Sequence, residues 1–75
     1  MNWFMQQRQA WIAEMLFVYG FVHRRHLQRK FGIGYLQASR DLQEFARLHR
    51  EAVRYSQKQQ CYFDISNGNR DLLRP

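Results

Sequence analysis

The 75-residue sequence predicts one small α+β domain, mainly α, in which three helices are followed by a β-hairpin. Apolar residues recur at three- and four-residue spacing through residues 6–49, and after Glu51 two short β-prone runs replace them. A chain this short buries about 60% of its unfolded surface, which leaves room for one core. Its 45% of hydrophobic residues provide enough apolar surface for that core to fold.

The first predicted helix spans residues 6–19 and ends at Gly20. Its apolar stripe consists of Trp11, Ile12, Met15, Leu16 and Tyr19. Phe21 and Val22 are expected to return to the core as a short connector. The second predicted helix spans residues 23–31, and Gly32 is its natural end because glycine accepts the left-handed conformation that closes a helix.

The third predicted helix spans residues 35–49. Its core face is expected to consist of Ala38, Leu42, Phe45 and Leu48 or His49, and its opposite face of Leu36, Gln37, Arg40, Gln43 and Arg47. Predicted strands at 52–55 and 61–65 flank the polar stretch SQKQQ, whose Lys58 lies at the tip of the hairpin. Residues 1–65 are therefore the predicted domain, and 66–75 a loose tail or linker.

Three helices and a hairpin, with a tight turn between the second and third helices, are the plan of a winged helix-turn-helix. Gly32 would close the second helix, Ile33 would plug the space between the helices, and Gly34 would open the third. If these residues face inward, the N-terminal half of the third helix faces outward. It can then enter a DNA major groove about 12 Å wide.

The basic residues are concentrated in the middle of the chain. Nine basic and three acidic residues lie between positions 23 and 58, so this segment carries the whole net charge of +6. An asymmetric basic charge is the electrostatic footprint of a nucleic-acid binder, and double-stranded DNA is the expected partner. The alternative is a solvated basic surface that serves solubility.

The segment FGIGYLQASRDLQEF, residues 31–45, resembles the turn and recognition helix of winged helix-turn-helix regulators of the DeoR type. The matching residues are Gly32, Ile33, Gly34 and Arg40-Asp41-Leu42. Residues 21–45 and the hairpin resemble more closely the N-terminal domain of bacterial and phage WYL-domain repressors, and the resemblance covers residues 8–65. It implies a sequence-specific transcriptional regulator acting as a repressor. No WYL domain follows Pro75, so a stand-alone repressor and a fragment with a further C-terminal domain both stay open.

The third helix supplies the expected base contacts, because arginine suits guanine and glutamine suits adenine. The candidates are Gln37, Ser39, Arg40 and Gln43, with Arg47 further along the same helix. For Arg40 the alternative is an ion pair with Asp41 or Glu44. Tyr35 and Ser39 could also contact phosphates near the helix N-terminus, and for Tyr35 the alternative is packing over the turn.

Further phosphate contacts are expected from the second helix and the hairpin. The candidates are Arg24, Arg25, Arg54 and Lys58. Arg29, Lys30 and Arg50 are interpreted as ordinary surface charge. The hairpin lacks the paired exposed aromatics of a base-stacking platform, which favours DNA over RNA.

Other functions find little support in the sequence. His23, His26, His49 and Cys61 have poor spacing for zinc, so no metal and no cofactor are expected, and Cys61 is interpreted as a buried hydrophobe. No catalytic motif occurs, so the chain is not expected to be an enzyme. The lone cysteine and the absence of a membrane-length apolar run favour a cytoplasmic, nucleoid-associated protein.

The N-terminal sequence MNWFM leaves a second function open. Trp3 and Phe4 are too apolar for a free tail and are expected to form a homodimer contact. A dimer would let two recognition helices address half-sites one helical turn apart. The alternative is a protein-interaction module, such as a phage-type inhibitor that uses the winged helix to bind a protein partner.

Overall fold

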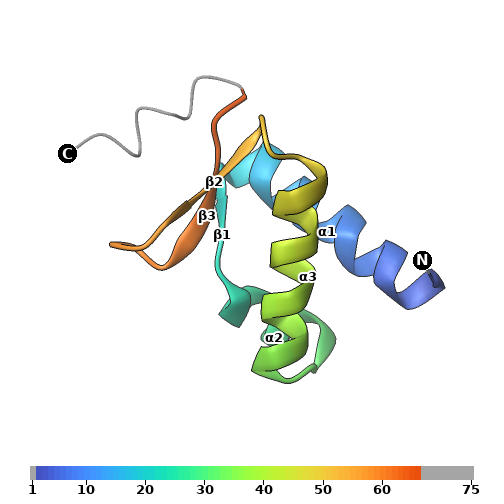
Figure 1. Cartoon of the computed structure of the whole chain (residues 1–75). Coiled ribbons are helices and arrows are strands. Elements are labelled where there is room, and N and C mark those ends of the chain that lie inside the picture. Colours follow the sequence, from blue (N-terminus) through green and yellow to red (C-terminus); the bar gives the residue numbers. More distant parts are fainter. Residues whose placement is uncertain (1, 67–75) are drawn as a thin grey trace.

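The computed structural model describes residues 2–66, which form three helices and a three-stranded antiparallel sheet (Figure 1). In chain order the elements are α1 (Trp3–Tyr19), β1 (Phe21–Val22), α2 (Arg24–Phe31), α3 (Tyr35–Leu48), β2 (Val53–Ser56) and β3 (Cys61–Asp64). The predicted mainly helical α+β fold, with three helices before a hairpin, is confirmed. The predicted tail 66–75 lies outside the described residues, apart from Ser66.

Helix α1 begins three residues earlier than the predicted start at residue 6. The cause is Asn2, whose Oδ1 accepts a hydrogen bond from the Met5 backbone N–H at 2.8 Å. Asparagine is among the best N-terminal caps because its short side chain satisfies an otherwise unpaired N–H group. The first turn of α1 therefore carries Trp3 and Phe4, whose rings meet edge to face at 5.2 Å.

The short connector predicted at Phe21–Val22 forms a strand, β1, which the sequence did not indicate. Gly20 ends α1 with φ at 88° and donates its N–H to the Leu16 carbonyl oxygen. The chain then pairs antiparallel with β3, so the sheet order is β1-β3-β2. This pairing anchors the hairpin of β2 and β3, called the wing below, to the helices.

The two glycines in the turn between α2 and α3 have the predicted roles. Gly32 adopts the left-handed conformation, with φ at 65° and ψ at 33°, and its N–H donates to the Gln28 carbonyl oxygen. Gly34 begins α3 without a side-chain cap. Ile33 between them is half-buried and packs against the core. The turn thus holds α3 against α2, while the first residues of α3 remain exposed.

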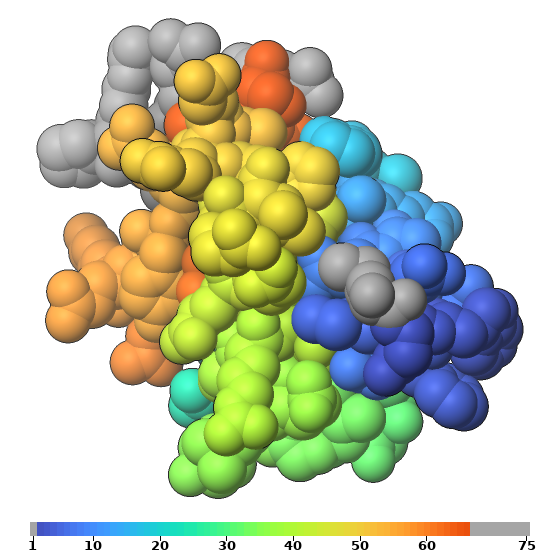
Figure 2. All heavy atoms as spheres, turned by 45° about the vertical axis from the view of Figure 1, so that its right-hand side comes forward, coloured from blue at the N-terminus to red at the C-terminus, as the bar shows by residue number. Residues whose placement is uncertain are grey.

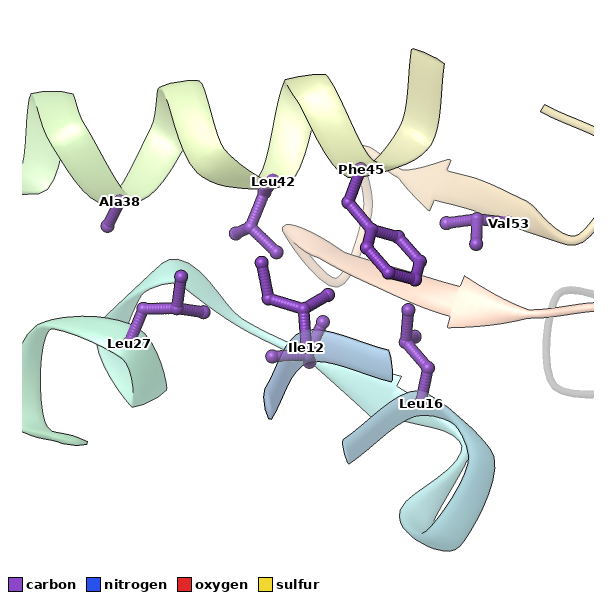
Figure 3. Packing of buried hydrophobic residues seen from close by; sticks show 8 residues of the cluster. Ile12, Leu16, Leu27, Ala38, Leu42, Phe45 and Val53 are labelled. Carbon is purple, nitrogen blue, oxygen red and sulfur yellow. The ribbon is translucent and has the colours of Figure 1, made fainter. Parts of the chain in front are cut away.

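The core lies where the three helices meet the sheet (Figure 3). Its buried residues are Ile12, Leu16, Val22, Leu27, Ala38, Leu42, Phe45 and Val53. Two predicted core residues, Tyr19 and Leu48, are instead 63% and 48% exposed, because each lies in the last turn of its helix. His49 is exposed as well, and its ring stacks on Phe45 with 4.2 Å between the ring centroids.

Candidate nucleic-acid interface

Helix α3 presents one face to the core and the opposite face to solvent. Because Ala38, Leu42 and Phe45 are buried, the far side of the helix is exposed. The exposed residues there are Leu36, Arg40, Gln43 and Arg47. Figure 2 shows α3 in yellow to green at the centre of one face, with the orange wing beside it. This arrangement leaves the N-terminal part of α3 free to approach base edges.

Arg40 is exposed, and the carboxylates expected to compete for it are engaged elsewhere. Asp41 is fully buried and pairs with Arg8 at 2.5 Å, and Glu44 pairs with Arg47. Within residues 2–66 the Arg40 side chain forms no ion pair. Its guanidinium is therefore available for a guanine edge or a phosphate.

Arg47 is placed on the same exposed face but already has a partner. Its Nη2 lies 2.5 Å from Glu44 Oε1, and its Nε lies 3.1 Å from Glu44 Oε2. The hydrogen bond from Arg47 lowers the pKa of Glu44, and the same bond raises the pKa of Arg47. A DNA phosphate at this position would have to compete with the carboxylate.

A groove of about 450 Å³ separates α3 from the wing. Three residues predicted to contact DNA line it together, namely Arg24, Ser39 and Gln43. The other lining residues are His23, Leu42, Tyr55, Gln60 and Tyr62. The groove thus joins the start of α2, the middle of α3 and the inner face of the wing into one surface with both polar and apolar groups.

The wing contributes two tyrosines that the sequence analysis did not select. Tyr55 and Tyr62 face each other across β2 and β3, with 4.9 Å between their ring centroids. The expectation that the hairpin lacks paired exposed aromatics overlooked this pair, in which Tyr55 is 52% exposed and Tyr62 is half-buried. Burial and the neighbouring Tyr55 raise the pKa of Tyr62. The Tyr62 phenol therefore stays protonated near neutral pH and can donate a hydrogen bond into the groove.

Arg24 and Tyr35 bring the starts of α2 and α3 together. The Arg24 guanidinium carbon lies 5.6 Å from the centre of the Tyr35 ring, within the range of a cation–π contact. Tyr35 remains 56% exposed, so it packs over the turn and is still accessible. The position of Tyr35 is therefore compatible with a phosphate contact and with packing over the turn.

Three of the four phosphate contacts predicted in the second helix and the hairpin lie outside the groove. Adjacent strand residues face opposite sides of a sheet, so Arg54, opposite Phe63, faces away from Tyr55. It lines a separate hollow with Arg50, Glu51 and Ile65. Arg25 borders a third hollow, and Lys58 is exposed in the wing loop. Their roles in DNA contact remain predictions that require DNA to extend beyond the groove.

Gln37 is held at the side of α3 by Asp41. Its Nε2 donates a hydrogen bond to Asp41 Oδ1 at 2.9 Å, and the side chain is half-buried. Helical spacing predicted Gln37 on the face opposite the core, and it gave no sign of the role of Asp41, whose partner Arg8 lies 33 residues away. Two exposed side chains of the predicted base-contacting group therefore remain, Arg40 and Gln43, with half-buried Gln37 and Ser39 on either side.

Two histidines cap the start of α2. His23 Nδ1 accepts from the Arg25 backbone N–H at 3.0 Å, and His26 Nδ1 accepts from the His23 backbone N–H at 3.1 Å. Both bonds require an unprotonated Nδ1 atom. Burial, followed by the charge of neighbouring basic residues, lowers the pKa of both histidines. The pair thus orders the segment that carries Arg24 and Arg25.

Acid is expected to weaken the fold through these caps. A histidine whose pKa is lower in the folded than in the unfolded state contributes stability that is complete above about pH 6.5. That contribution is lost as the pH falls through the lowered pKa values. Urea unfolding at pH 7.5 and pH 5 would measure the loss. It should be smaller in His26→Gln, because glutamine can accept the same bond without titrating; an equal loss would contradict the role of His26.

Residues 2–66 contain no group of three or more His, Cys, Asp or Glu side chains that could hold a metal ion. None of their helices is long and apolar enough to cross a membrane. Cys61 is buried as predicted, and burial raises the pKa of its thiol.

Helix α3, the exposed second helix of the helix-turn-helix, and the adjoining wing define the class of protein. The chain is a winged helix-turn-helix domain. Residues 5–70 match the model for the BrxR transcriptional regulator winged helix-turn-helix domain, and the chain belongs to this family. A search of the curated proteins found no match. Membership of a transcriptional-regulator family indicates DNA-binding regulation and favours a non-enzymatic role.

Proposed function

We propose that the domain binds double-stranded DNA at a specific sequence and represses transcription by occluding a promoter. Helix α3 would lie in the major groove, with the wing on the adjacent backbone or minor groove. The observation that supports this most strongly is the groove in which Arg24, Ser39 and Gln43 meet two wing tyrosines. Arg40 stands beside these residues on the exposed face of α3 without a competing carboxylate.

Phosphate contacts would supply much of the affinity and make it depend on salt. Arg24, Arg25, Arg54 and Lys58 are exposed and are the proposed phosphate contacts. With about four phosphate contacts, the logarithm of affinity falls with a slope of about −3.6 against the logarithm of salt concentration. Affinity should then drop about a hundredfold between 50 and 200 mM salt.

Selection from random-sequence duplexes at two salt concentrations tests the proposal. Sequencing of the bound fraction should show an enriched motif at both concentrations, because base contacts persist when phosphate contacts weaken. Salt-sensitive binding without enrichment would reduce the function to non-specific attraction by a basic surface. No binding at either concentration would overturn DNA binding and favour a protein partner.

A homodimer through the first turn of α1 is part of the proposal. Trp3 and Phe4 are 64% and 67% exposed although they are large and apolar. Their edge-to-face contact makes one preformed aromatic patch, the kind of surface that dominates protein interfaces. Two copies joined there could place two α3 helices on half-sites one helical turn apart.

Trp3→Ala is expected to weaken this dimer at least about 30-fold, the change that corresponds to a hot-spot contribution of about 2 kcal/mol. Sedimentation equilibrium measures the change, and circular dichroism confirms the fold. Phe17→Ala is the matched control, because Phe17 is an exposed aromatic near the other end of α1. Unchanged dimerisation in Trp3→Ala, or an equal loss in Phe17→Ala, would contradict the assignment.

We also propose a relation of segment 31–45 to DeoR-type regulators and WYL-domain repressors. It is based on the resemblance of Gly32, Ile33 and Gly34 and of Arg40-Asp41-Leu42 to their motif. A regulator of this kind would act on the nucleoid in the cytoplasm. Residues 1–65 would be its DNA-binding unit.

A further inference from the structure

We propose that Asp41, held by Arg8, fixes the amide of Gln37 in the orientation that contacts adenine. Gln37 would then determine sequence specificity, while Asp41 and Arg8 would act as positioning residues that never touch DNA. The inference rests on the proposed function of α3 as a recognition helix. It adds the identity of a base and the reason for its selection.

Asp41 is the centre of a hydrogen-bonded cluster between α1 and α3. Its side chain is fully buried, and Oδ2 accepts a bond from Arg8 Nε at 2.5 Å. Oδ1 accepts from Arg8 Nη2 at 3.4 Å and from Gln37 Nε2 at 2.9 Å. Gln9 Nε2 donates to the backbone oxygen of Asp41 at 2.8 Å. The carboxylate is therefore fixed from two helices.

This carboxylate decides which way the Gln37 amide points. A carboxylate paired with a guanidinium accepts hydrogen bonds and donates none. If the amide were flipped, its oxygen would lie about 2.9 Å from a negatively charged oxygen, which is repulsive. The Gln37 amide must therefore keep its nitrogen toward Asp41, and rotation about its last bond is blocked.

The fixed amide is complementary to adenine. Bidentate recognition of adenine requires a carbonyl oxygen that accepts from N6 and an N–H that donates to N7. Asp41 uses one N–H, and we assign it the hydrogen on the far side from Oε1. The other N–H and Oε1 then remain as a donor and acceptor pair. Gln37 is the third residue of α3, in the turn from which recognition helices contact bases.

Gln43 provides the contrast within the same helix. It is exposed and lies in the groove toward the wing, two turns from the start of α3. Within residues 2–66 neither Asp41 nor Glu44 accepts a hydrogen bond from its amide, since their bonds come from Arg8, Gln37 and Arg47. Its amide can therefore adopt either orientation, and it should discriminate bases less sharply than Gln37.

Titration of a selected duplex, with all four base pairs tested at each position, measures the effect. Wild-type protein should prefer adenine at one position of each half-site by at least about fivefold, the factor equivalent to about 1 kcal/mol. Gln37→Met keeps the side-chain length and removes the hydrogen bonds. The affinities for duplexes with adenine and with other bases at that position should then become nearly equal. Gln43→Met should change the profile at a different base pair.

The positioning step is tested by Arg8→Met/Asp41→Asn. This double variant removes both charges without leaving either one buried alone, and its asparagine can donate to Gln37 as well as accept from it. The adenine preference should fall at least about threefold at the Gln37 position and persist elsewhere. If circular dichroism shows that this variant is unfolded, Arg8→Lys tests the same step, because lysine lacks the fork that holds both carboxylate oxygens.

The outcomes separate this inference from the proposed function. A wild-type protein without base preference at any position overturns the proposed function itself. A sequence-specific protein whose profile is unchanged in Gln37→Met overturns the adenine assignment alone. Loss of the preference in Gln37→Met, with full retention in the folded positioning variant, overturns the role of Asp41 and Arg8.

Discussion

Asp41→Ala is expected to lower the free energy of unfolding by about 3 kcal/mol, because it leaves the Arg8 charge without its partner in a nearly buried site. The Arg8 side chain is 15% exposed, which places the loss at the lower end of the range for broken buried pairs. A domain of this size has about 4–11 kcal/mol of stability in all. Urea unfolding followed by circular dichroism at pH 7.5 measures the loss.

Glu44→Ala is the matched control for that measurement. It also removes one carboxylate from α3 and breaks an ion pair, but the pair with Arg47 lies at the surface. Exposed ion pairs contribute little because water solvates both partners well. The unfolding curve of Glu44→Ala should therefore stay close to that of the wild type. Equal losses in the two variants would contradict the importance of burial at Asp41.

Arg40→Ala is expected to remove discrimination in favour of guanine, a loss of about 1–3 kcal/mol at one base pair of each half-site. The substitution should leave the fold intact, because Arg40 is exposed and forms no ion pair within residues 2–66. Competition binding between a selected duplex and versions of it in which that guanine is replaced by another base measures the change. Affinity for unrelated duplex should fall much less than affinity for the selected one.

Arg29→Ala controls for the loss of charge alone. Arg29 is exposed near the end of α2 and has the same side chain, but it does not lie on the exposed face of α3. It should lower affinity for all duplexes slightly and alike. If Arg29→Ala changed the guanine preference as much as Arg40→Ala, the position of Arg40 on α3 would not explain specificity.

Local sequence signals predicted the helix-turn-helix well. Helical spacing placed Ala38, Leu42 and Phe45 in the core, and the two glycines marked the turn to within one residue. These features depend on residues close together in the chain. The start of α1 was missed although its signal, a capping Asn2, was present in the sequence.

Features that depend on distant partners were not predictable in the same way. The strand β1 has two residues and exists because Phe21 and Val22 pair with Phe63 and Tyr62. Asp41 follows Arg40 in the sequence and looks like a surface charge until Arg8, on another helix, is seen against it. Burial of a carboxylate therefore became visible when the fold was known.

The candidate site was predicted in part. Arg24, Ser39 and Gln43 do come together in the groove, but Tyr55 and Tyr62 were not selected. Strand alternation could have found them, because it places residues 53 and 55 on one face of β2 and Arg54 on the other. The alternation was available in the sequence, whereas the face of the wing that meets α3 was not.

Dimethyl sulfate protection on a selected duplex tests most directly whether α3 enters the major groove. The reagent methylates guanine N7, which is exposed in the major groove, and adenine N3, which is exposed in the minor groove. Bound wild-type protein should protect guanine N7 within each half-site, and Arg40→Ala should lose that protection while still bound at low salt. Protection confined to adenine N3, or none in a saturated complex, would contradict the placement of α3 in the major groove.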